Sequence, residues 1–256
     1  MEVSKKPRLD LAKKTLPEAL FRSLVFLFEQ GLQDCMLVGG TALAGFYAGH
    51  RKSDDLDLFV AHPQAFKATI LAVMALKQKD IELEEGIKTP QYYRTTCQAQ
   101  DHSFTVDVVL DPGFFEVGSY IQLKNKVCVA TLETLLMTKI ATLVSRCSEK
   151  DLYDLVWLFR ECHLNDWHAL IDLGRKIDSG VQIESILLSI LGTEPKASAC
   201  GFAESFGTPR KKVLEAIIRF KNKMSADLAN LAQKEPNLSI PLRDLKKLLR
   251  QIKKTQ

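Results

Sequence analysis

The sequence predicts a mixed α/β part followed by a helical part. A short apolar run over residues 36–38 ends in Gly39-Gly40 and leads into a helix-forming stretch. Two runs, Tyr92–Cys97 and Phe104–Leu110, are rich in the β-branched and aromatic residues that are typical of strands. After Asp166 the chain alternates helical runs with Gly- and Pro-containing breaks. Together these patterns favour a sheet in the first half and a helical second half.

Along the chain, the first helix is predicted to begin at the capping-box pattern of residues 15–18, with Pro17 in its first turn. Apolar residues then recur at helical spacing until Gly31. After the strand at 36–38, a second helix runs from Thr41 to about Tyr47. The later elements follow from the same signals: strands over 56–60 and 126–130, and helices over 63–79, 131–146, 148–162, 208–232 and beyond Pro241.

Length and composition limit the class of protein to which the chain can belong. Of 256 residues, 46% are apolar and 26% charged, which is typical of an ordinary soluble protein. We find no uncharged apolar window of the length that spans a membrane, and no apolar core of a secretory signal in the first residues. We place a domain boundary near residue 125, with an α/β domain over 1–125 and a helical domain over 126–256 that completes an active-site cleft.

The cysteines argue against zinc and favour reduced thiols. They stand at positions 35, 97, 128, 147, 162 and 200. None forms a Cys-x-x-Cys pair, and no neighbouring histidine completes a zinc pattern. Because most of them lie in or beside apolar segments, we expect buried thiols and a cytoplasmic location.

Charge is concentrated at the two ends of the chain. The net charge is only +4, but residues 1–14 and 243–254 are both strongly basic. Such ends could bind nucleic-acid phosphate, or they could be solvated surface and a tail. Composition leaves both interpretations open.

The most informative residues are two aspartates in an apolar run. Side chains of a strand alternate, so Asp55 and Asp57 point to the same side, whereas Asp54 faces away towards solvent. Two carboxylates together can bind Mg²⁺ when substrate phosphates supply further oxygens. The preceding Gly39-Gly40 turn allows a phosphate to approach the backbone and a helix N-terminus closely.

Asp107 is the third candidate carboxylate. It stands in the apolar strand Phe104–Leu110, where a charge is costly without a partner. An active-site role is one explanation, and a salt bridge to a lysine at a strand edge is the other. Asp111, which precedes Pro112 and Gly113, is better explained as a turn residue.

The order of these features resembles the nucleotidyltransferase superfamily that includes polymerase β. The shared pattern is Gly-Gly, a spacer, Asp-x-Asp and a later carboxylate. A closer resemblance is to the AbiEii/AbiGii toxin family of nucleotidyltransferases, through Gly39–Leu43, Arg51–Phe59 and Met137–Leu155. The resemblance covers roughly residues 15–160.

That resemblance implies a fold, a reaction and cofactors. The fold would be a polymerase β-like α/β domain, a mixed sheet with flanking helices, followed by a helical domain. The reaction would transfer a nucleoside monophosphate from an NTP to an acceptor hydroxyl, with two Mg²⁺ ions stabilising the entering and leaving oxygens. Asp107 would complete the second metal site or take the proton of the hydroxyl.

The resemblance also implies roles for residues outside the carboxylate triad. Lys139 would contact the triphosphate instead of snorkelling to solvent. Asp151 and Asp154, three apart on one helix face, would bind nucleotide or orient Lys139, although Asp151 could simply cap its helix. The full set of predicted NTP-binding residues is Gly39, Gly40, Thr41, Arg51, Ser53, Lys139, Lys150, Asp151 and Asp154. Thr41 could instead cap its helix, and Arg51 and Ser53 could instead order the loop.

The resemblance further implies a toxin of a toxin–antitoxin system, with an RNA acceptor such as a tRNA 3′ end and a cognate antitoxin. A small-molecule acceptor, as in aminoglycoside nucleotidyltransferases, and a non-catalytic nucleotide-binding module are the alternatives. The preferred NTP, the acceptor and the oligomeric state do not follow from the sequence.

Overall fold

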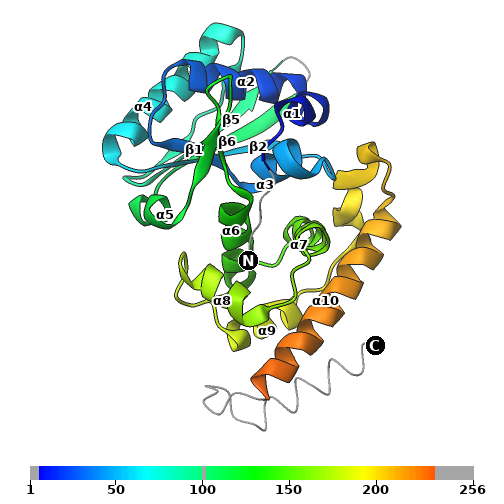
Figure 1. Ribbon diagram of the computed structural model, residues 1–256. Helices are drawn as coiled ribbons and strands as arrows, with labels where there is room; N and C mark the ends of the chain where they lie inside the picture. Colours follow the sequence, from blue (N-terminus) through cyan, green and yellow to red (C-terminus); the bar gives the residue numbers. More distant parts are fainter. Residues whose placement is uncertain (1–5, 100–101, 234–256) are drawn as a thin grey trace. The chain divides into compact units, whose positions relative to one another are not determined.

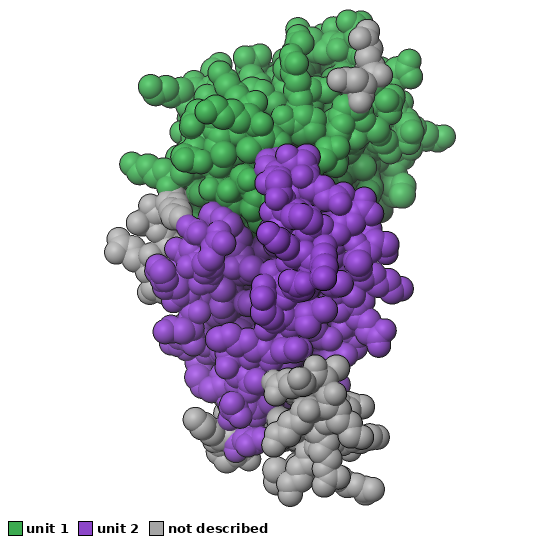
Figure 2. Space-filling model, turned by 90° about the vertical axis from the view of Figure 1, so that its right-hand side faces the viewer, with its two compact units in different colours: residues 1–135 green, residues 136–256 purple. Residues whose placement is uncertain are grey.

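The structure is a computed structural model that describes residues 6–99 and 102–233. The chain divides into two compact units, residues 1–135 and 136–256 (Figure 2). The first unit extends past residue 125 because the short strands β7 (Tyr120–Gln122) and β8 (Cys128–Ala130) pair within its sheet. The second unit begins inside helix α6 (Leu132–Ser145).

The first unit is built on a mixed sheet (Figure 1). Its other strands are β1 (Cys35–Val38), β2 (Asp55–Val60), β3 (Glu82–Leu83), β4 (Ile87–Lys88), β5 (Tyr92–Gln98) and β6 (Ser103–Leu110). The strand order is β3-β5-β6-β2-β1-β8-β7, with β4 also paired to β5. The pairs β2–β6 and β1–β8 are parallel, and the other pairs are antiparallel. The sheet confirms the predicted strands, including the one near residue 128.

Helices flank this sheet. They are α1 (Leu9–Thr15), α2 (Glu18–Glu29), α3 (Gly39–Leu43) with a π-helical extension over Ala44–Ala48, α4 (Pro63–Met74) with a 3-10 turn over Ala75–Lys79, and α5 (Pro112–Val117). Helix α4 packs on β2 and β6, and α3 contacts β1 and β2. His62 caps α4 by accepting a hydrogen bond from the Ala65 amide at 3.1 Å. Asp111 caps α5 in the same way, through the Phe114 amide at 2.9 Å.

Two predicted helix starts differ from the structure. Thr15 does not cap α2: it ends the unpredicted helix α1, and its hydroxyl donates to the Leu11 carbonyl at 2.9 Å. Threonine hydroxyls readily form such bonds four residues back, which compete with capping. Helix α2 and the later helix α10 (Arg210–Ala232) each begin directly after a proline, without a side-chain cap. A proline just before or at the first turn loses no helical hydrogen bond, so it is compatible with a helix start at these positions.

The second unit is helical, as predicted. Besides α6 and α10 it contains α7 (Glu149–Glu161), α8 (Trp167–Arg175), α9 (Ile183–Gly192) and a 3-10 segment over Ala197–Phe206. Helix α10 packs against α7, α9 and the 3-10 segment. The ring centroid of Phe159 on α7 lies 5.0 Å from the ring centroid of Trp167 and 4.9 Å from that of Phe220. The predicted basic helix beyond Pro241 lies outside the described residues.

Two expectations from composition can be compared with the described part of the chain. There, none of the helices combines the length and apolar character that crossing a membrane requires. The six cysteines carry free thiols, and all but Cys162 are buried. Burial raises the pKa of Cys35 to about 12, so this thiol stays protonated.

Candidate active site

The strand register places three aspartates on one face of the sheet. Along β2, buried and partly exposed residues alternate, and Asp55 and Asp57 both fall on the partly exposed face. The parallel neighbour β6 sets Asp107 beside Asp57 and Thr105 beside Asp55. Residues that are paired across strands point the same way, so the two strands present three carboxylates together. The sequence pattern suggests that these aspartates lie close together, and the register of β2 and β6 defines which residues are neighbours.

Asp107 has partners on the next strand, β5. The Tyr92 hydroxyl donates a hydrogen bond to Oδ1 of Asp107. Nη1 of Arg94, the direct cross-strand partner of Asp107, lies 3.9 Å from the same oxygen. Burial and the Asp107 carboxylate raise the pKa of the Tyr92 phenol, which keeps the hydroxyl protonated and able to donate. The sequence left a salt bridge to a lysine as the alternative explanation for Asp107, and the cation that lies beside it is Arg94.

Thr105 connects the carboxylates of the two strands. Its hydroxyl donates to Oδ1 of Asp55 at 2.8 Å and lies 3.5 Å from Oδ2 of Asp107. Tyr92, Arg94 and Thr105 were not singled out from the sequence. The available signal was their two-residue spacing within strands: Tyr92 and Arg94 share one face of β5, and Thr105 and Asp107 share one face of β6.

The Gly-Gly turn accommodates the side chains of the site. Gly39 has φ +69°, and a β-carbon there would collide with the carboxylate of Asp57. At Gly40, a β-carbon would lie 2.5 Å from Nη2 of Arg51 and 3.1 Å from the Ser53 hydroxyl. The two glycines therefore make room for a carboxylate on one side and a guanidinium on the other.

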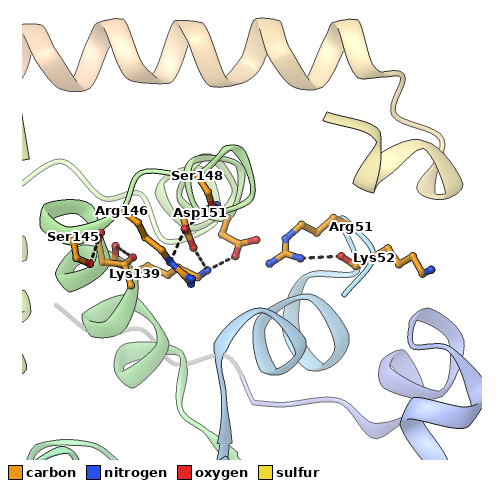
Figure 3. Close-up of polar contacts among 9 residues, drawn as sticks. Arg51, Lys52, Lys139, Ser145, Arg146, Ser148 and Asp151 are labelled. Carbon is orange, nitrogen blue, oxygen red and sulfur yellow. Dashed lines mark hydrogen bonds and ion pairs between the residues drawn. The ribbon is translucent and has the colours of Figure 1, made fainter. Parts of the chain in front are cut away.

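Three other predicted NTP-binding residues of the first unit, Thr41, Arg51 and Ser53, are buried. Thr41 is fully buried, and its hydroxyl donates to the backbone carbonyl of Asp55, which ties α3 to the start of β2. Arg51 is 3% exposed and donates to the Lys52 carbonyl at 2.8 Å (Figure 3). Ser53 is also buried. These contacts order the loop that leads into Asp55, and a phosphate contact of Thr41, Arg51 or Ser53 stays a prediction.

Asp54 lies just before β2, which begins at Asp55, so strand alternation does not set its direction. Its Oδ1 lies 3.2 Å from Nζ of Lys52 and 3.2 Å from Nε2 of His102. It is partly exposed and belongs to the loop that precedes β2.

His62 has no predicted catalytic role, and its contacts are structural. It caps α4, and its Nε2 lies 3.1 Å from Oδ2 of Asp34.

In the second unit, Lys139 on α6 is the centre of a buried ionic cluster (Figure 3). Its Nζ lies 2.8 Å from Oδ1 of Asp151 and 2.7 Å from Oδ2 of Asp154. The carboxylates come from one face of α7, as their three-residue spacing predicts. Lys139 therefore does not snorkel to solvent.

Asp151 has two further partners. It receives a hydrogen bond at 2.6 Å from the hydroxyl of Ser148, the N-cap of α7, and Nε of Arg146 lies 3.4 Å from its Oδ2. Burial alone would raise the pKa of Asp151, but Lys139, Ser148 and Arg146 outweigh burial and lower it. Asp151 stays ionised, and Lys150 beside it is exposed.

The chemistry of the donors fits Mg²⁺. In the described ranges, no set of three or more His, Cys, Asp or Glu side chains is gathered closely enough to hold a metal by itself. Mg²⁺ does not require such a set, since one or two carboxylates together with substrate phosphates and water usually bind it. Asp55 and Asp57 provide two carboxylates on one face, and the turn that begins with Gly39 lies against Asp57. The residues present suit a magnesium ion that arrives with a nucleotide.

Comparison with known proteins decides the family. Residues 19–199 match the family described as "Nucleotidyl transferase AbiEii toxin, Type IV TA system". The chain belongs to this family. It is thus a nucleotidyltransferase, and both the carboxylate face and the Lys139 cluster fall inside the matched residues. A search among curated proteins found no match.

The chain is also similar, at low sequence identity, to several solved structures. MenT4, a nucleotidyltransferase toxin from Mycobacterium tuberculosis H37Rv, is 14% identical, with coverage of 96% of this chain and 97% of that chain and a TM-score of 0.49. JHP933 from Helicobacter pylori is 16% identical, with coverage of 89% and 97% and a TM-score of 0.47. A cytoplasmic RNA terminal U-transferase is 13% identical, with coverage of 94% and 93% and a TM-score of 0.30.

Proposed function

We propose that this AbiEii-family nucleotidyltransferase uses Mg²⁺ to transfer a nucleoside monophosphate from an NTP to a hydroxyl of RNA, such as the 3′ end of a tRNA, as the toxin of a toxin–antitoxin pair. The observation that carries the proposal is the single sheet face that holds Asp55, Asp57 and Asp107, with Gly39 set against Asp57. Family membership supports an NTP substrate and an antitoxin partner. The RNA acceptor rests on the resemblance and on the basic ends of the sequence.

In the reaction we propose, the acceptor oxygen bonds to the α-phosphorus, the bond from that phosphorus to the β-phosphate oxygen breaks, and pyrophosphate leaves. Asp55 and Asp57 would hold the divalent ion and so position the triphosphate. Bound Mg²⁺ would neutralise phosphate charge and stabilise the entering and leaving oxygens. The acceptor proton passes to a carboxylate oxygen of Asp107 or, if Asp107 is itself a metal ligand, to solvent.

Lys139 would contact the triphosphate in this scheme, together with Arg51 and Lys150. Asp151 and Asp154 hold the Lys139 ammonium at 2.8 and 2.7 Å, so they fix its position and its charge. Buried and paired in this way, Lys139 is preorganised, and little side-chain entropy is lost when it meets an anion.

The test is a labelling reaction with a matched pair of variants. The purified protein is incubated with Mg²⁺, each α-³²P-labelled NTP in turn and total cellular RNA. Wild type and Asp54→Asn should label an RNA band, whereas Asp55→Asn and Asp57→Asn should lose at least about a hundredfold in rate, because metal-bound charge stabilisation contributes several kcal/mol. Asp54 is the control because it is an adjacent aspartate that is paired with Lys52 and His102 instead.

Other results would redirect the proposal. Full activity of Asp57→Asn would refute the metal assignment. Labelled product that migrates as a small molecule, with no RNA labelled, would refute the RNA acceptor and leave nucleotidyl transfer in place. Failure of every NTP to bind or react would leave only the family relationship.

A further inference from the structure

One face of three adjacent strands carries an unbroken row of polar side chains. Asp57 on β2 is paired with Asp107 on β6, which is paired with Arg94 on β5. Tyr92 lies two residues from Arg94 on the same strand and therefore on the same face. Thr105 fills the neighbouring position beside Asp55.

Within this row, two hydroxyl groups each hold one carboxylate. The Tyr92 hydroxyl donates to Oδ1 of Asp107, and the Thr105 hydroxyl donates to Oδ1 of Asp55 at 2.8 Å. In both cases the donor comes from a neighbouring strand, so the sheet itself sets its place. The other oxygen of Asp107, Oδ2, lies 3.5 Å from the Thr105 hydroxyl.

We propose that Tyr92 and Thr105 are positioning residues that orient the carboxylates of Asp107 and Asp55 for a divalent cation. This inference rests on the proposed function, since it presumes that the carboxylates meet a metal. The terminal torsion of an aspartate is broad, so a free carboxylate would sample many orientations. A fixed hydroxyl donor selects one of them before the cation arrives. Outer partners of metal ligands typically contribute 10–100-fold in metal affinity or activity.

The strand β5 also provides a matched control. Tyr93 follows Tyr92 in the chain but points to the opposite face and is buried there. Tyr92→Phe and Tyr93→Phe each remove one phenolic oxygen and nothing else. A general effect on the fold should therefore be seen in both variants, whereas an effect through Asp107 should be seen only in Tyr92→Phe.

The experiment measures Mn²⁺ binding to the full chain in the presence of a non-hydrolysable NTP analogue, because the carboxylates are expected to bind the ion together with phosphates. Binding is followed by electron paramagnetic resonance, with thermal unfolding recorded in parallel. We expect Tyr92→Phe and Thr105→Val to weaken Mn²⁺ binding by about 10-fold or more. Tyr93→Phe and Thr105→Ser, which retains the hydroxyl, should bind within about twofold of wild type. Unfolding temperatures of Tyr92→Phe and Thr105→Val should stay close to wild type.

The outcomes separate this inference from the proposed function. If wild type binds Mn²⁺, Asp55→Asn does not, and both hydroxyl variants bind as tightly as wild type, the positioning role is refuted while the metal site stands. Equal weakening in Thr105→Val and Thr105→Ser would show that shape, not the hydroxyl, matters at that position. Absence of Mn²⁺ binding by wild type would overturn the proposed metal site, and the inference with it.

Discussion

Asp57 and Gly39 occupy adjoining space so closely that a β-carbon on Gly39 would overlap the Asp57 carboxylate. The turn and the aspartate are eighteen residues apart in the chain, but β1 and β2 pair antiparallel and bring them together through the Val38–Asp57 register. Glycine at position 39 thus serves two needs: a backbone with φ +69° and a free volume beside a carboxylate.

Gly39→Ala should therefore reduce nucleotidyl transfer by about a hundredfold or more, because a methyl group would push Asp57 out of place and a displacement of about 1 Å can cost that much. The measurement is the rate of label transfer from NTP, with circular dichroism to verify that the variant folds. The control is Gly31→Ala. Gly31 also has a positive φ, +79°, but its β-carbon would meet nothing within 4 Å.

Both variants carry the strain of alanine at positive φ, about 1 kcal/mol or somewhat more. Only Gly39→Ala adds the collision with Asp57. If both variants lost activity equally, backbone strain would explain the loss. If Gly39→Ala stayed fully active, Asp57 would not need the position seen in the structure.

The sequence was sufficient for features that depend on local pattern. The alternation of Asp55, Leu56 and Asp57 predicted which side chains share a face, and the burial along β2 confirms it. The helix predicted over 148–162 begins where expected: Ser148 is the N-cap of α7, and the Asp151 amide donates to its hydroxyl at 3.2 Å. These features need only the period of a strand or the geometry of one helical turn.

The sequence was not sufficient for features that depend on pairing between distant segments. Tyr92 and Thr105 reach Asp107 and Asp55 only because β5, β6 and β2 are neighbours in one register. A shift by one residue would turn every one of these side chains to the other face. No local pattern encodes that register. Helix α1 was missed for another reason. Ala12 is its one buried residue, and a single buried residue gives no recognisable helical periodicity.

The burial of Lys139 makes stability the property to measure for this residue. The structure buries it between two carboxylates, so removal of the ammonium leaves uncompensated charge inside the second unit. Lys139→Met should lower the free energy of unfolding by about 3–5 kcal/mol, the usual effect of breaking a buried ion pair. The measurement is urea unfolding followed by tryptophan fluorescence. Both tryptophans, Trp157 and Trp167, lie in the second unit and report on it.

The comparison variant for Lys139 is Lys150→Met. Lys150 is an exposed lysine on α7, so its change should stay within about 0.5 kcal/mol. Similar small effects in both variants would show that the cluster around Lys139 does not stabilise the second unit. NTP binding by Lys139→Met has to be measured without denaturant and at a temperature at which the variant is still folded, because an unfolded variant would lose binding for a different reason.

Asp151 should make the stability of the second unit depend on acid. Burial alone would raise the pKa of Asp151, but the opposing effect of Lys139, Ser148 and Arg146 is larger, so the pKa in the folded protein lies below the ordinary 3.8. A carboxylate whose pKa is depressed by folding adds stability that is present above its unfolded pKa and is lost as the pH falls through its folded pKa. The contribution is therefore complete at neutral pH and declines below about pH 4.

Asp151→Asn removes this titration. Tryptophan-detected urea unfolding at several values between about pH 7 and pH 3 should show wild type losing more stability on acidification than Asp151→Asn, which is already destabilised at neutral pH. Asp172→Asn is the control: Asp172 forms an exposed ion pair with Arg175 at 3.1 Å, and such pairs contribute little. Its pH dependence should match wild type. Equal losses for wild type and Asp151→Asn would mean that the Lys139 cluster is not what acid breaks in the second unit.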